Sequence, residues 1–259
     1  MERTYTESKK QVIRREKQKV QRALPGNTWT QREKVALACR ILHSHGHESG
    51  LAGQVTARES EHGFFTQRLG CGLSEVTPSN LLSVDEELNV MEGEGAPNPA
   101  NRFHAWVYRA RPDVQCIVHT HPLYSSALSM LGVPLVVAHM DSCALYDNIA
   151  FLEDWPGVPV GDEEGRLIST AIGNKAGLLL AHHGVVLAGR TVEEACVLAL
   201  QFERTARLFL TARSVGPVRT IPRELGLAAR DWLLTPRRVD ATFAYYARAE
   251  LANDPRCIA

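Results

Sequence analysis

The sequence has no excess of charge of either sign. Its 29 Lys and Arg residues balance 29 Asp and Glu residues, so the formal net charge is zero. Proteins that bind nucleic acid or anionic membranes usually carry a basic footprint, which this balance does not suggest. No apolar run approaches the roughly 18 residues of a membrane-spanning helix, and no apolar signal segment opens the chain. We therefore expect neither a nucleic-acid partner nor a membrane partner.

Paired cysteines are also missing. The six cysteines are scattered along the chain, without a CxxC pair or a tight framework. This distribution is typical of reduced, structural cysteines, so we expect a cytoplasmic protein.

Apolar residues make up 44% of the 259 positions, which is enough for one large core. Residues 1–24 are charged and lack a clear apolar stripe, and we expect an arm or frayed helix there. No repeat or linker divides residues 25–259, which favours a single domain that includes a C-terminal helical extension. Short strand-like segments such as GQVTARE, GFFTQRL and LLSVD alternate with helical patterns, which predicts an α/β fold with a mixed sheet.

Histidines are abundant, and two of them stand two residues apart in CIVHTHP. In a strand, residues i and i+2 face the same side, so His119 and His121 can aim at one point while Thr120 faces away. LLLAHHG offers two more histidines at the end of a second apolar strand, just before a glycine. Three histidines with an open position are typical of a catalytic metal site. Histidines on a strand are also common as polar core residues, and the residues alone leave both readings open.

For the other histidines we expect structural roles rather than metal binding. His43, His45 and His47 have alternate spacing, but they fall at the end of a predicted helix, where such residues diverge. We expect a solvated polar terminus there. His104 lies on a helix predicted for NRFHAWVYRARPDV, and we expect it to be hydrogen bonded and to orient a ligand.

The combination of NRFHAWVYRARPDVQCIVHTHP with the later LLLAHHGVVLAGRTVEEA resembles the class II aldolase/adducin family, over a match from Arg32 to Ser214. The resemblance implies a three-layer α/β/α fold on a mixed, largely antiparallel sheet. It also implies a cyclic homotetramer with active sites between neighbouring subunits. By the same resemblance, His119, His121 and His183 bind one divalent metal ion: zinc, or alternatively iron, manganese or cobalt.

His182 stands where the family often has asparagine, and the resemblance places it just outside the ligands. In HMDSCALYDN, the resemblance offers Asp141 and Tyr146 as candidate catalytic acid/base groups that reach a neighbour's site. Tyr245, with Tyr246, resembles tyrosines that close the site, and Tyr245 is a third catalytic candidate. Asp141 could equally cap a turn, and Tyr146 could equally be a core residue.

The sequence departs from the phosphosugar aldolases of the family where they carry PSSE. It reads PNPA, so Ala100 replaces the glutamate that serves as general acid/base and metal ligand. Asn98 and Pro99 replace two phosphate-binding serines, and proline has no N–H to donate. Gln54 replaces the asparagine of a second phosphate loop. We therefore expect a carboxylate or carbonyl substrate rather than a sugar phosphate, with the TPSN loop and Arg102 as partners for a carboxylate. The alternatives are that Arg102 only covers the helix surface and that donors elsewhere rebuild a phosphate pocket.

The resemblance thus implies a metal-dependent lyase that acts on a small molecule. Such an enzyme would break a C–C bond of a metal-chelating hydroxy or keto acid, by aldol cleavage or decarboxylation, through an enolate-like intermediate. An iron-dependent oxygenase or oxidative decarboxylase on the same scaffold is an alternative. A non-catalytic, adducin-like oligomeric scaffold is another, although a scaffold would not need all three histidines.

Overall fold

The computed structural model describes residues 8–259. Within that range, no helix is both long enough and apolar enough to cross a membrane. The strands are β1 (Gln54–Ser60), β2 (Gly63–Gln67), β3 (Leu81–Asp85), β4 (Val90–Glu92), β5 (Cys116–Thr120), β6 (Ile149–Leu152), β7 (Gly177–Leu180) and β8 (Val185–Gly189). The helices are α1 (Lys9–Ala23), α2 (Gln31–Ser44), α3 (Asn101–Ala110), α4 (Leu123–Ser129), α5 (Asp162–Ile172), α6 (Val192–Arg213), α7 (Arg223–Leu233) and α8 (Pro236–Asn253).

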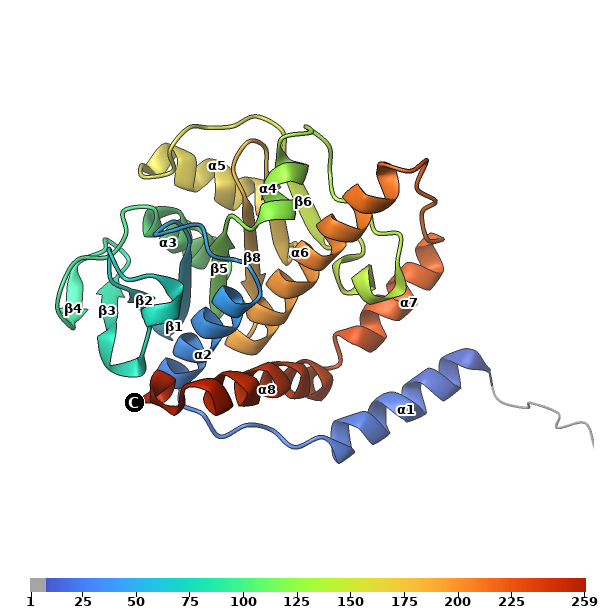
Figure 1. The fold of residues 1–259 in the computed structure, drawn as a ribbon, viewed down its shortest axis with the longest axis horizontal. Helices are drawn as coiled ribbons and strands as arrows, with labels where there is room; N and C mark the ends of the chain where they lie inside the picture. The colour runs from blue at the N-terminus through green and yellow to red at the C-terminus, as the bar shows by residue number, and fades with distance from the viewer. Residues whose placement is uncertain (1–7) are drawn as a thin grey trace, which may run out of the picture.

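The eight strands form one sheet in the order β4-β3-β2-β1-β5-β8-β7-β6 (Figure 1). Neighbouring strands are antiparallel except β6 and β7, which are parallel. The mixed, largely antiparallel sheet expected from the sequence is therefore confirmed. β5 lies between β1 and β8, and all five of its residues are buried.

Two hydrophobic cores cover the two faces of the sheet and make three layers. One core joins α2, α6 and α8 to the sheet, and the other joins α3 and α5 to the opposite face. Side chains alternate along β5: Cys116 and Val118 enter the first core, and Ile117 enters the second. By the same alternation His119 lies on the α3 face and Thr120 on the α6 face. The end of β5 therefore offers side chains to both layers.

The first helix, α1, lies outside these layers and contacts α8 (Figure 1). Ser8 caps it, and Gln11 reaches back to the Ser8 backbone N–H in a capping box. At its other end, the Gln21 side chain accepts a hydrogen bond from the Arg237 backbone N–H at 3.3 Å.

Candidate metal centre

Three histidine side chains converge at the end of β5. His119 belongs to the strand, His121 follows it directly, and His183 lies in the turn between β7 and β8. Their ring centroids are 4.6–4.9 Å apart, and one nitrogen from each ring lies within 4.8 Å of the others. The resemblance to the family predicted the convergence, but the sequence pattern placed His183 at the end of a strand. A position in a turn lets its ring fold back over the end of β5.

The turn that carries His183 is tight. The Leu180 N–H donates to the Gly184 carbonyl oxygen at 2.9 Å, and His182 adopts a left-handed φ of 58°. A Cβ atom on Gly184 would lie 2.5 Å from the His121 ring and 2.6 Å from the Thr120 carbonyl oxygen, so only glycine fits. The His182 side chain is exposed, so the expectation that it lies against the ligands is wrong.

Hydrogen bonding fixes which nitrogen of His119 is free. Its Nδ1 lies 3.1 Å from the Val185 carbonyl oxygen, which can only accept, so Nδ1 carries the hydrogen. Its Nε2 faces the Nε2 of His121 at 3.0 Å. A tetrahedral zinc ion with bonds of about 2.0–2.1 Å separates its ligand nitrogens by roughly 3.3 Å. The donor set therefore fits a divalent ion.

Burial keeps the three imidazoles neutral. It lowers the pKa of His119 well below its usual value, with further lowering from His121 and His183. Burial also lowers the pKa of His121, and burial followed by the nearby His121 lowers that of His183 to about 4. Neutral imidazole is the form that binds a metal, so the site needs no deprotonation near neutral pH.

Glu203 of α6 fixes the chain that leaves His121. Its carboxylate accepts hydrogen bonds from the backbone N–H groups of Tyr124 and Ser125, both at 2.8 Å, and from the Ser125 hydroxyl at 2.7 Å. A carboxylate at a helix N-terminus also interacts favourably with the helix dipole. Sequence reasoning missed Glu203, although Pro122 opens α4 without a capping side chain, which signals that a cap comes from elsewhere.

Two buried polar groups beside the triad have an atom without a partner. Gln54 lies directly opposite His119 across β1 and β5, is 3% exposed, and its Oε1 accepts no hydrogen bond from the described residues. His104 bonds through Nδ1 to the Thr56 hydroxyl at 2.8 Å, while its buried Nε2 has no partner there. His104 is therefore only half satisfied, and both residues can pair with a ligand.

The three acid/base candidates lie away from the triad. Asp141, in the 3₁₀ helix η3 (Met140–Leu145), is exposed and 3.6 Å from the Arg204 guanidinium. The Tyr146 hydroxyl donates to the Ile221 carbonyl oxygen at 3.0 Å. Tyr245 is 63% exposed. Within residues 8–259 of the chain, no hydrogen bond or ring contact joins any of the three to the triad.

The expectation that Arg102 pairs with a substrate carboxylate is wrong. Its guanidinium donates to Asp162 at 2.5 Å and to Glu87 at 2.7 Å, on the outer side of α3. The TPSN loop is also engaged, because the Ser79 hydroxyl donates to the Ala259 carbonyl oxygen at 3.1 Å. Asn98, at the place of a phosphate-binding serine, accepts a hydrogen bond from the Ala100 N–H through Oδ1 at 3.0 Å.

His47 is not part of a solvated helix end, and the expectation is wrong for this residue. It is fully buried, and its Nδ1 lies 2.9 Å from the Thr120 hydroxyl. Burial, followed by the nearby His45, lowers the pKa of His47 to about 3. Thr120 faces away from the triad, as the strand spacing predicted, and pairs with His47 behind the sheet.

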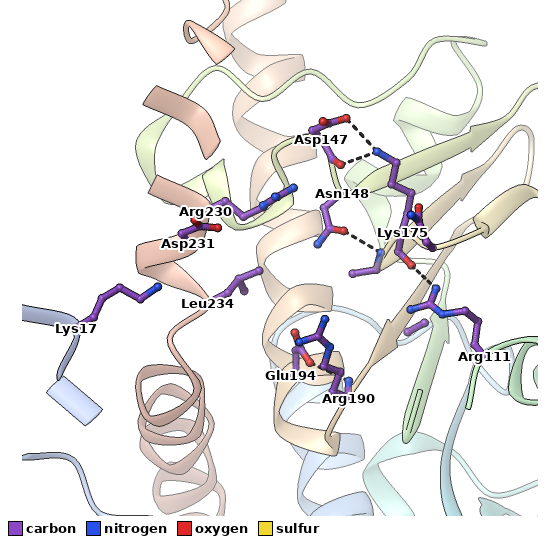
Figure 2. A pocket seen from close by; sticks show the side chains of 13 residues that line it. Lys17, Arg111, Asp147, Asn148, Lys175, Arg190, Glu194, Arg230, Asp231 and Leu234 are labelled. Atoms are coloured by element: carbon purple, nitrogen blue, oxygen red, sulfur yellow. Dashed lines mark hydrogen bonds and ion pairs between the residues drawn. The ribbon is translucent and has the colours of Figure 1, made fainter. Parts of the chain in front are cut away.

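A cavity of about 470 Å³ lies at the other end of the sheet, where β7 begins and β8 ends (Figure 2). Charged side chains line it, and many of them pair with one another or with backbone groups. Lys175 Nζ lies 3.0 Å from Asp147 Oδ1, and Arg111 donates to the Lys175 carbonyl oxygen at 3.1 Å (Figure 2). None of the three histidines lines this cavity, so its size does not mark the metal centre.

Comparison with known proteins gives concordant matches. The family model described as Class II Aldolase and Adducin N-terminal domain matches residues 33–210. The chain is 30% identical over 182 residues to Decarboxylase NovR of Streptomyces niveus, covering 69% of this chain and 67% of that protein. It is 29% identical over 210 residues to 3,4-dihydroxyphthalate decarboxylase of Arthrobacter keyseri, covering 74% and 84%. The structure of L-fuculose 1-phosphate aldolase from Glaciozyma antarctica PI12 matches with a TM-score of 0.82 at 25% identity, covering 93% and 99%.

Proposed function

Because this chain belongs to the class II aldolase and adducin family, we propose that it is a divalent-metal-dependent carbon–carbon lyase. Its substrate is a small hydroxy or keto acid that chelates the metal. The observation that carries the proposal is the convergence of three neutral imidazoles, with one nitrogen of each within 4.8 Å of the others. Relatives named as decarboxylases and as an aldolase support this reaction class.

His119, His121 and His183 would hold the metal, with zinc as the expected ion and iron, manganese or cobalt as alternatives. A bound divalent ion would act as a Lewis acid on adjacent substrate oxygens and would stabilise the negative charge left when a C–C bond breaks. The chain itself fixes the geometry. The Val185 carbonyl orients His119, and Glu203 holds the start of α4 behind His121.

Gln54 and His104 would orient the substrate. The Gln54 amide lies opposite His119 with an unpaired oxygen, and His104 keeps an unpaired Nε2 nearby on the same face. Leaving buried polar atoms unpaired costs free energy, so these atoms favour a ligand with hydroxyl or carboxyl groups. Substrate binding would pair them and offset that cost.

Decarboxylation is the favoured reaction because Ala100 offers no base at the start of α3. When CO₂ leaves, the electron pair of the broken C–C bond stays on the substrate carbon, so no base is needed to begin the step. A proton must arrive afterwards. We propose that Asp141, Tyr146 or Tyr245 of a neighbouring subunit supplies it in a homotetramer.

Elemental analysis of anaerobically purified protein tests the metal, and a screen of hydroxybenzoates and aliphatic hydroxy acids for CO₂ release tests the reaction. We expect one divalent ion per chain and release of CO₂ that stops when the ion is chelated. Protein that lacks metal and cannot be loaded with it would overturn the proposal. Efficient cleavage of L-fuculose 1-phosphate would contradict the substrate class while leaving the metal site intact.

A further inference from the structure

A second cavity, of about 400 Å³, lies behind the metal centre on the α6 face of the sheet. His47, Tyr124, Gln201, Arg204, Arg207 and Tyr246 are among the residues that line it. The link to β5 is Thr120, whose hydroxyl bonds to His47 at 2.9 Å. Since Thr120 faces away from His119 and His121, the sheet separates this cavity from the triad.

Two buried polar atoms in the walls of this cavity have no partner among the described residues. His47 is fully buried, and Thr120 takes its Nδ1, which leaves Nε2 unpaired. The Oε1 of Gln201 is likewise buried and unpaired. Buried polar groups in proteins are almost always hydrogen bonded, so two such atoms at one cavity call for a ligand with matching polar groups.

The cavity is also positively charged. Arg204 and Arg207 lie on its rim, and Glu203 is the only acidic residue among the described lining residues. Three hydrogen bonds to the start of α4 already occupy the Glu203 carboxylate. The Arg204 guanidinium lies 3.6 Å from the exposed Asp141, and Arg207 lies over the Tyr124 ring at 5.4 Å. Arg207 forms no ion pair with the described residues, and the Arg204–Asp141 pair is long and exposed and so contributes little, which leaves both guanidinium groups able to bind an anion.

We propose that this cavity binds a small hydroxylated carboxylic acid with a planar apolar body, independently of the metal centre. Arg204 and Arg207 would bind the carboxylate, because guanidinium and carboxylate form paired hydrogen bonds. A hydroxyl group would pair with Gln201 and His47, and the apolar body would lie between the rings of Tyr124 and Tyr246. A phosphate fits less well, because a dianion needs several converging donors and the buried amide oxygen is an acceptor.

Isothermal titration calorimetry with 4-hydroxybenzoate tests this site. The metal-loaded wild type is compared with a His119→Ala/His183→Ala variant, which separates this cavity from the metal centre and from the proposed function. We expect the probe to bind both proteins with the same Kd, because its hydroxyl and carboxylate lie at opposite ends of the ring and cannot chelate one metal ion together. Replacing Arg204 and Arg207 by Gln should raise that Kd at least about tenfold, since charge-assisted hydrogen bonds are lost. Arg213→Gln, on the same helix outside the cavity, should leave Kd unchanged.

Two further measurements test the hydroxyl contact and the preference for a carboxylate. Gln201→Met should raise Kd severalfold for 4-hydroxybenzoate but not for benzoate, and it keeps the test open if the double arginine variant fails to fold. Inorganic phosphate should not compete with the probe. The proposal is overturned if the probe does not bind at millimolar concentration, if binding disappears with the triad, or if Gln201→Met leaves it unchanged. Strong competition by phosphate would overturn the carboxylate assignment.

Discussion

The two ends of the central sheet carry polar groups of opposite character. Where β5 ends, the polar groups are buried imidazoles that burial holds neutral. Where β8 ends, they are exposed charges that pair with one another, such as Lys175 and Asp147 (Figure 2). The pKa of Asp147 falls to about 2, because of the hydrogen bond from Lys175 and then that from Arg223. Burial keeps the imidazoles neutral, so their nitrogen lone pairs are available to a metal ion. At the exposed end, the side chains stay charged and form ion pairs with one another.

The largest expected effect comes from removing a ligand at the histidine end. His121→Ala should abolish stoichiometric metal binding, with a loss greater than the roughly 10–100-fold that follows from losing an outer partner of a ligand. The chain should stay folded, because the cores do not depend on the ion. His182→Asn is the matched control, since this side chain is exposed and asparagine tolerates the left-handed φ of 58° at this position. Metal retained by His121→Ala, measured by elemental analysis, would contradict the assignment.

Lowering the pH should reduce the stability contributed by the buried imidazoles before it affects that contributed by the charged end. Burial lowers the pKa of His104 to about 3, and it does the same for His47, from an ordinary 6.5. The unfolded chain therefore binds more protons below pH 6.5, and the free energy of unfolding falls as pH drops towards 4, by roughly 1.4 kcal/mol per pH unit for each group. The contribution of Asp147 is fully present above its usual pKa of 3.8 and is lost only as the pH falls from there through its folded pKa of about 2.

Urea titrations of metal-free protein between pH 7 and 4 measure this slope. His47→Asn should flatten it, and Asp147→Asn should not. A stability that stays constant from pH 6.5 to pH 4.5 would show that these imidazoles are protonated in the folded protein.

Packing at the histidine end should tolerate no added methyl group. Gly184→Ala places a Cβ 2.5 Å from the His121 ring, so we expect a loss of about 1–3 kcal/mol in stability and weaker metal binding. Gly216→Ala, beyond the end of α6, meets nothing within 4 Å and serves as the control. Thermal unfolding and metal titration of both variants check the expectation, and equal effects at the two glycines would refute it.

Two glutamates allow a matched comparison of the two ends, because the carboxylate of each accepts hydrogen bonds from backbone N–H groups at one end of the sheet. Glu203 receives those of Tyr124 and Ser125, and Glu194 receives that of Arg190 at 2.8 Å. Replacement by Ala should cost about 0.5–2 kcal/mol at each position, as for other helix caps. Only Glu203→Ala should also weaken metal binding. Metal titration of the two variants distinguishes a positioning role from a purely structural one.

The smallest effect should come from the charged end. Asp147→Asn removes a charge paired with Lys175 and Arg223, but the group is exposed and such pairs contribute little. Asn also tolerates the left-handed φ of 53° at this position. Neither the melting temperature nor metal binding should change measurably, and a large drop in either would show that this end supports the metal centre.

The sequence predicted the α/β class and the shared face of His119 and His121 because both depend on local spacing, whereas the assignment of His183 to the same site rested on the resemblance to the family. The alternation HTH places two imidazoles on one face of β5, and glycine after His183 signals a close approach. The long capped helix after Thr191 and the strand-like segments follow from periodicity in the same way.

Contacts between distant parts of the chain escaped prediction. His47 bonds to a residue 73 positions away, so its spacing from His43 and His45 carried no information on its burial. Arg102 is taken by Asp162, 60 positions later, and Glu203 caps a helix that begins 80 positions before it. No period in the sequence encodes these pairs, because the sheet order brings them together.

The alternation at the end of β5 has a practical meaning for protein engineering. Consecutive side chains here face opposite sides of the sheet, so a combinatorial library at Gln201 or Arg204, which line the cavity on the α6 face, can be screened without replacing the histidines that would hold the metal. Libraries at Gln54 and His104 would explore the side of the sheet that carries the histidines. We expect substitutions in the two libraries to interact through Thr120. Its hydroxyl bonds to His47 on the α6 face, while His119 and His121, its neighbours in the sequence, face the other side of the sheet.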